Sequence, residues 1–133
     1  MKKILIVLLL SFATAAFAQE DPIGQQLFPP ELIMAQSQKL HLDDKQRTTI
    51  KNEVQRAQSK FFDLQWQLKE ASDTMVDLLQ QTPVDEARVL DQADKVMGLE
   101  HDIKKIHLSM LIRIKNALTP EQIAQLKQLR AAK

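Results

Sequence analysis

The sequence has 133 residues, with 18 Lys and Arg against 17 Asp and Glu, two Gly and no Cys. This length is enough for one domain, and the lack of Cys excludes a fold stapled by disulfides. The near-neutral charge argues against nucleic-acid binding, which needs a basic face that neutralises phosphates.

The first 18 residues have the pattern of a cleaved secretory signal peptide. Lys2 and Lys3 precede an apolar run over residues 4–10, and Ala16-Phe17-Ala18 forms a small-x-small cleavage site. The alternative, an uncleaved anchor, needs about 20 apolar residues. We therefore expect cleavage after Ala18, a periplasmic location and no stable membrane insertion of the mature protein. Removing Lys2 and Lys3 from the 18 basic residues leaves 16, against 17 acidic ones.

A short helix is predicted after an irregular N-terminal segment. Residues 19–29 include Pro22 and Gly24 and show no period, so they predict a flexible arm. Pro30 suits the first position of a helix, which we expect to run from about Glu31 to Leu40. The folded domain is expected to span residues 30–131.

Two long helices of similar length are predicted next. Residues 43–81 lack Gly and Pro, and their apolar residues recur in alternating steps of four and three. Residues 83–117 carry a similar stripe. Such seams are typical of helices that pack lengthwise on each other. With Thr82 as cap and Pro83 in the first position of the second helix, they predict an antiparallel hairpin. The predicted seams are Ile50, Val54, Ala57, Phe61, Leu64, Leu68, Ala71, Met75 and Leu78, against Val89, Ala93, Val96, Leu99, Ile103, Ile106, Met110, Ile114 and Ala117.

One capping motif occurs twice, in residues 42–46 and 118–122. Asp43 and Thr119 can accept from the free N–H groups of the coming helix, while Gln46 and Gln122 reach back to the N–H of the cap residue. The second copy starts a final helix, from Pro120 to about Arg130. The fold class is therefore all-α, a long antiparallel helical hairpin with a short helix at each end. We expect both short helices to cover the apolar end of the hairpin, including Leu108, Leu111 and Ile112.

Phe62 and Trp66 face away from the predicted seam, one turn apart. An outward apolar pair usually marks a protein–protein surface. Three assignments are open: a homodimer interface, a contact with the short helices, or a surface that binds client proteins.

The leader, the short-long-long-short helix pattern and the two LTxxQ-like motifs resemble the Spy/CpxP family of periplasmic stress proteins. Leu118-Thr119-Pro120-Glu121-Gln122 matches the motif in full, and the first copy has Asp43 in place of Thr. Residues 27–32 are more similar to the heavy-metal-resistance branch, whose members are often named periplasmic heavy-metal sensors. The resemblance implies a curved antiparallel homodimer.

The resemblance implies two classes of function, both based on binding. The first, slightly favoured, is an ATP-independent chaperone or accessory, which holds exposed apolar segments of an unfolded client or of an envelope-stress sensor. Such a protein needs no cofactor, and the sequence has no nucleotide-binding loop. The second is a sensor or carrier of a divalent metal such as zinc, nickel, cobalt or copper.

The candidate metal ligands are Glu100, His107 and Met110. His107 and Met110 are three residues apart, a workable helical spacing, but Glu100 and His107 are about 10.5 Å apart along the axis. Further donors must come from the facing helix, where we expect Glu53, Gln55 or Gln58 nearest His107. A structural role for His107 stays open. The remaining candidates are His41 and the pair of Met97 and His101. We expect His101 to be a solvated residue on the outer face.

The nickel and cobalt sensors of the family carry a His-x-x-x-His pair in the first helix. Those positions fall at about Ile33 and Ser37, which are not such ligands, so that set does not carry over. Catalysis is not expected either, because the sequence offers no nucleophile–base pair and no phosphate-binding loop.

Overall fold

The computed structural model describes residues 21–132, which form helices and turns without a strand. A 3-10 turn, η1 (Gly24–Gln26), precedes α1 (Pro30–Ala35), and two long helices follow, α2 (Asp44–Leu79) and α3 (Glu86–Asn116). The last helix is α4 (Pro120–Ala131). The predicted signal peptide and its cleavage site lie outside the described residues. None of the helices within residues 21–132 has the length and apolar character needed to cross a membrane.

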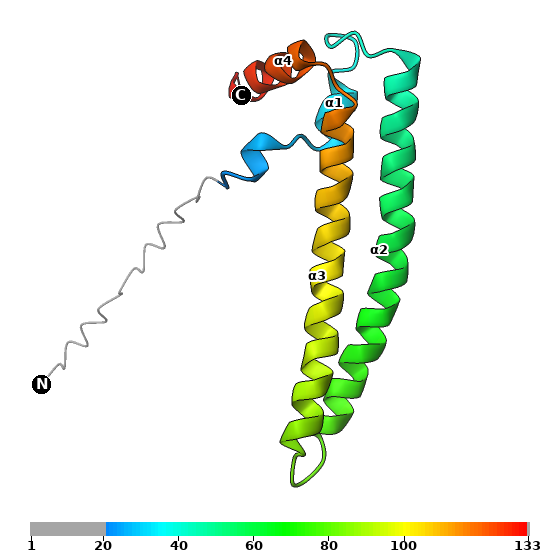
Figure 1. Ribbon diagram of the computed structural model, residues 1–133, viewed down its shortest axis with the longest axis vertical. Coiled ribbons are helices and arrows are strands. Elements are labelled where there is room, and N and C mark those ends of the chain that lie inside the picture. The colour runs from blue at the N-terminus through cyan, green and yellow to red at the C-terminus, as the bar shows by residue number, and fades with distance from the viewer. Residues whose placement is uncertain (1–20, 133) are drawn as a thin grey trace, which may run out of the picture.

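The predicted all-α hairpin is confirmed. α2 and α3 run antiparallel side by side, and α1 and α4 lie at the end opposite the α2–α3 turn (Figure 1). The 36 residues of α2 give it a length of roughly 54 Å.

On the exposed side of α2, the hydrogen bond and the charge of Asp73 raise the pKa of Lys69, whose Nζ lies 2.7 Å from Asp73 Oδ2.

Both copies of the capping motif act as predicted. Asp43 Oδ1 accepts from the N–H of Gln46 at 2.7 Å, and Thr119 Oγ1 accepts from the N–H of Gln122 at 3.2 Å. In return, each Gln accepts from the N–H of its own cap residue, Gln46 from Asp43 at 3.1 Å and Gln122 from Thr119 at 2.9 Å. The starts of α2 and α4 are thus fixed by the same local chemistry.

The two glutamines also bond to each other. Gln46 Nε2 donates to Gln122 Oε1 at 2.7 Å, and Gln122 Nε2 donates to Gln46 Oε1 at 3.2 Å. Their amide groups reach further backbone carbonyls, Gln46 that of Ala117 and Gln122 that of Leu40, both at 3.0 Å. We call this pair the glutamine clasp. It joins the first turns of α2 and α4 to the loops beside them.

Two predicted helix boundaries are wrong. α1 ends at Ala35, and turns continue to His41, whose φ of 52° lies in the left-handed region. Leu40 is nevertheless buried, because the turns fold it into the core. α3 is capped by Asp85, which accepts from the N–H of Arg88 at 3.2 Å, and not by Thr82.

The segment predicted as a flexible arm packs against the rest of the chain where the structure describes it. Phe28 is 1% exposed, and the Arg130 guanidinium stacks over its ring at 4.7 Å from the centroid. Arg130 also donates to the carbonyls of Gly24, Gln25 and Leu27, the last at 2.6 Å. Phe28 therefore belongs to the core.

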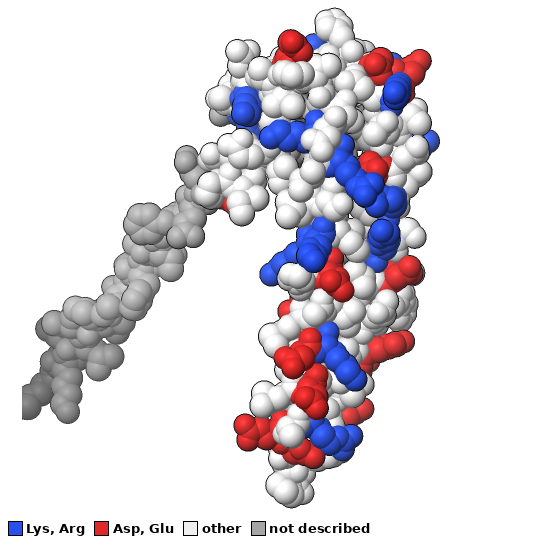
Figure 2. Space-filling view, in the orientation of Figure 1, with Lys and Arg blue, Asp and Glu red and all other residues white. Residues whose placement is uncertain are grey.

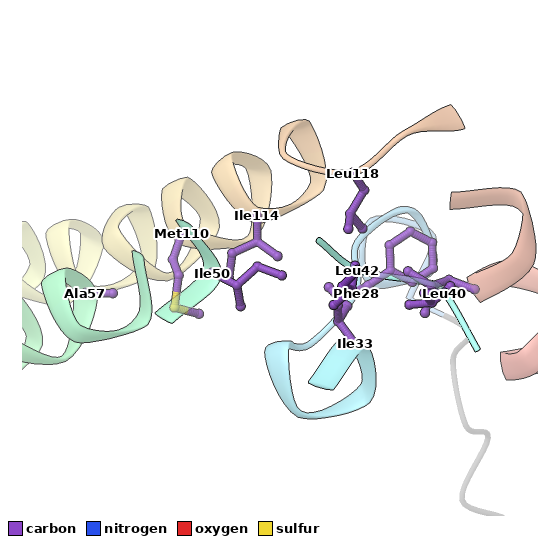
Figure 3. Close-up of a cluster of buried hydrophobic side chains, with 10 residues drawn as sticks. Phe28, Ile33, Leu40, Leu42, Ile50, Ala57, Met110, Ile114 and Leu118 are labelled. Carbon is purple, nitrogen blue, oxygen red and sulfur yellow. The ribbon is translucent and has the colours of Figure 1, made fainter. Parts of the chain in front are cut away.

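The core is concentrated where α1 and α4 meet the hairpin (Figure 3). Its members come from every helix and from the turns between them. Toward the α2–α3 turn, most of the predicted seam is only half-buried, although Leu78 is buried, and Phe61 is 40% exposed. The predicted cover over Leu108 and Ile112 is also incomplete, because they are 41% and 43% exposed, whereas Leu111 packs on the core. The buried apolar cluster consists of Phe28, Ile33, Leu40, Leu42, Ile50, Ala57, Met110, Ile114, Leu118 and Leu126.

Candidate functional site

Two adjoining pockets lie where the first turn of α1 meets the hairpin. One measures about 260 Å³ and the other about 230 Å³. We call them the donor pockets, because both are lined by Glu31, His107 and Met110, three residues with metal-donor side chains. Pro30 also lines both, in the first position of α1, where its missing N–H costs no hydrogen bond.

The donor groups come from two helices that the core holds together. Ile33, one turn after Pro30, is fully buried and anchors α1 in the core, which brings Glu31 to the pockets. Met110 is 8% exposed, and its side chain extends from α3 toward α2, beside Ile50 (Figure 3). His107 lies one turn before it and is exposed to solvent. A carboxylate, an imidazole and a thioether therefore share one place.

Glu100, the predicted carboxylate ligand, is not among the residues that line the donor pockets. It is exposed on α3, and seven residues place it about 10.5 Å from His107 along the axis. Of the candidate metal ligands, His107 and Met110 line the same pockets, and the carboxylate beside them belongs to Glu31 and not to Glu100. The sequence did carry one signal for Glu31, its position just after Pro29-Pro30 at the start of a helix expected to cover this end.

The expected neighbours of His107 are only partly right. Gln58 lines the larger donor pocket, as predicted. Glu53 instead accepts from Arg56 at 2.7 and 3.1 Å, and its other oxygen lies 3.6 Å from Arg113. Gln55 lines a different pocket, on the other side of α1, with Met34. Among the residues of α2 that line the donor pockets, only Gln58 is polar.

The remaining candidates lie apart from the donor pockets. His101 is solvated as expected, with a side chain 67% exposed and Nδ1 4.0 Å from Asp102. Met97 is 55% exposed, and His41 lies in the turn before α2. Neither lines a donor pocket.

The kinds of donor group suit a metal ion, but there are fewer donors than a complete ligand set needs. Imidazole and thioether suit late transition metals, and carboxylate suits zinc as well. Within residues 21–132, however, no group of three or more His, Cys, Asp and Glu side chains could hold an ion. Tetrahedral zinc takes four ligands, so water or a second chain would have to supply a fourth beside Glu31, His107 and Met110.

Phe62 and Trp66 form a second candidate site, an aromatic pair on α2. Their ring centroids are 6.2 Å apart and the rings meet edge to face at 79°. Phe62 is 60% and Trp66 55% exposed. The assignment of this pair to a contact with the short helices is therefore wrong, since burial under α1 or α4 would remove that exposure. The two partner-binding assignments remain.

Comparison with known families identifies the family of this chain. The model of a family described as heavy-metal resistance matches residues 4–125. No curated protein and no solved structure matches the chain.

Proposed function

Because the chain belongs to the heavy-metal resistance family, we propose that it is a periplasmic sensor or carrier that binds a heavy-metal ion between α1 and α3. The observation that carries this proposal is the convergence of Glu31, His107 and Met110 on both donor pockets. The protein acts by binding and not by catalysis.

The three donors favour an ion that accepts nitrogen and sulfur as well as oxygen. The Irving–Williams order places copper, nickel, cobalt and zinc above manganese for such sites. Since an imidazole binds metal only in its neutral form, uptake is expected to release protons and to weaken in acid. Gln58, across the larger pocket, can supply an amide oxygen.

Binding at this place would also change the molecule. Glu31 belongs to α1, a helix of six residues, whereas His107 and Met110 belong to the long α3. An ion shared by both helices stabilises the docked position of α1, because any ligand that binds only one arrangement favours it by mass action. The fraction of molecules with α1 and the preceding segment docked on the hairpin would then increase with metal concentration.

Native mass spectrometry of the chelator-stripped mature protein, residues 19–133, tests this proposal by titration with zinc, nickel, cobalt and copper. We expect a discrete ion count that is lost in His107→Ala and reduced in Met110→Leu and Glu31→Gln, which preserve side-chain volume. His101→Ala is the matched control, because His101 lies on the same helix outside the pockets. A protein that stays metal-free at micromolar ion, or equal losses in both His variants, would refute the site.

A second candidate function is to hold apolar segments of a client or of an envelope sensor. The observation that favours it is the exposed Phe62–Trp66 pair, because large aromatic side chains dominate the energy of protein interfaces. We expect Phe62→Ser with Trp66→Ser to reduce the suppression of client aggregation. Val76→Ser with Leu79→Ser is the control, since those residues of α2 are 50% and 51% exposed. Equal activity in both double variants would exclude the pair.

A further inference from the structure

A groove between α2 and α3 carries several positive charges. It measures about 190 Å³ and is lined by Arg56, Lys60 and Lys105, by Ser109, and by the apolar Ala57 and Ile106. We call it the basic groove. Lys and Arg gather over α2 and α3 on the upper half of the face seen in Figure 2, in the orientation of Figure 1. The basic groove shares none of the three metal-donor residues proposed above.

The positive charge is only partly neutralised by the chain itself. Glu53, whose side chain is 18% exposed, pairs with Arg56 and lies 3.6 Å from Arg113. Among the ion pairs of residues 21–132, none involves Lys60 or Lys105. The lining of the groove therefore carries three cations and no carboxylate, and because only Arg56 among them is paired, with Glu53, two positive charges remain unpaired.

This excess is local and not a property of the whole chain, which is almost neutral. Farther toward the α2–α3 turn, the next pocket between the same helices is lined by Glu70, Asp102 and Lys95, a net negative set. Like charges that line one groove from two helices repel each other and oppose the packing of the hairpin. An anion in the groove would turn this repulsion into attraction.

The groups in the basic groove suit one class of anion. Arg56 donates from Nε and Nη2 to Glu53, and these two hydrogen bonds hold its side chain in place. Ser109 adds a hydroxyl donor from α3. Ala57 and Ile106 provide an apolar floor, next to which charge interactions are stronger than in open water. We propose that the basic groove binds a tetrahedral oxyanion of the phosphate type, with Lys60 and Lys105 as its main cationic contacts. Free phosphate and the phosphate of an anionic lipid share this chemistry.

Titration of the ¹⁵N-labelled mature protein with inorganic phosphate, at constant ionic strength set with chloride, tests the site by NMR. We expect saturable shifts around Lys60 and Lys105. Lys60→Gln with Lys105→Gln should weaken binding about tenfold, as expected for two partly exposed charge contacts. The matched control is Lys51→Gln with Lys104→Gln, which removes the same charge from the same helices outside the groove.

Shifts that do not saturate, or an equal loss in the control variant, would overturn the proposal, because both indicate a diffuse field. Co-sedimentation with vesicles of phosphatidylglycerol or of phosphatidylcholine then separates the two sources. Phosphatidylglycerol binding that is lost in the Lys60/Lys105 variant and competed by phosphate assigns the groove to lipid. Phosphate binding without vesicle binding assigns it to a free oxyanion.

Discussion

At the scale of single residues, the glutamine clasp explains why both capping motifs end in Gln. A Glu side chain could complete the capping box, since it too accepts from the cap N–H. Only an amide can accept from that N–H and also donate to the partner helix and to a carbonyl. Gln46 and Gln122 do all three.

We therefore expect Gln122→Ala to lower the free energy of unfolding by about 2–3 kcal/mol. Gln122 is 8% exposed, and its removal leaves the carbonyl of Leu40 and part of the Gln46 amide without a partner. Urea denaturation followed by circular dichroism measures the change. Gln125→Ala, which removes one exposed hydrogen bond to Lys39, is the control and should cost less than about 1 kcal/mol. Equal costs would mean that the clasp contributes no more than one exposed hydrogen bond.

At the scale of helices, Gly98 is the weak point of α3. Gly inside a helix costs about 1 kcal/mol relative to Ala. A Cβ built on Gly98 meets nothing within 4 Å, so packing within the chain does not require Gly there.

Gly98→Ala should accordingly raise the free energy of unfolding by about 1 kcal/mol, because it removes backbone freedom from the unfolded chain without a clash. Thermal unfolding of the wild type and the variant measures the gain. Destabilisation would contradict the prediction, and a gain that appears only at low protein concentration would point to a second chain packed against Gly98.

The helices and most of their ends could be predicted from the sequence, because they depend on local signals. The seam periods gave α2 and α3, and the Asp43/Gln46 and Thr119/Gln122 pairs gave the starts of α2 and α4. The predicted start of α3 was wrong because Thr82 and Asp85 are both good cap residues, and local chemistry does not determine which of them caps the helix.

The candidate metal site was less predictable than the helices. His107 and Met110 were found because they share one helix, so their spacing is visible in the sequence. Glu31 was missed because its position depends on how α1 docks, which is set by contacts such as those of Ile33 in the core, far apart in sequence. The packing of Phe28 under Arg130 was missed for the same reason.

At the scale of the whole molecule, the exposed apolar side chains favour association with another chain. We expect a homodimer, which the resemblance to the Spy/CpxP family implies, with Phe62 and Trp66 in its interface. Their exposed fractions of 60% and 55% are high for aromatic residues, and burying such side chains is the main driving force of most interfaces.

Light scattering coupled to size-exclusion chromatography tests this expectation. Phe62→Ser with Trp66→Ser should convert the dimer to a monomer and leave the helix content unchanged, because neither side chain is in the core. The control Val76→Ser with Leu79→Ser should remain dimeric. A dimer in both variants would place the interface elsewhere, and a monomeric wild type would reject the homodimer itself.

The uneven core has a mechanical consequence. Nearly all the fully buried side chains lie at the end where α1 and α4 close over the hairpin, whereas near the α2–α3 turn only Leu78 and Gln92 are buried among the described residues. Stability within one protein follows such differences in burial, and poorly packed regions open first. The hairpin is thus tightly packed at the end covered by α1 and α4 and loosely packed at the end near the α2–α3 turn. We therefore expect the end near the α2–α3 turn, where the two helices stay joined, to bend first and adapt to a partner's shape, while the glutamine clasp keeps the opposite end folded.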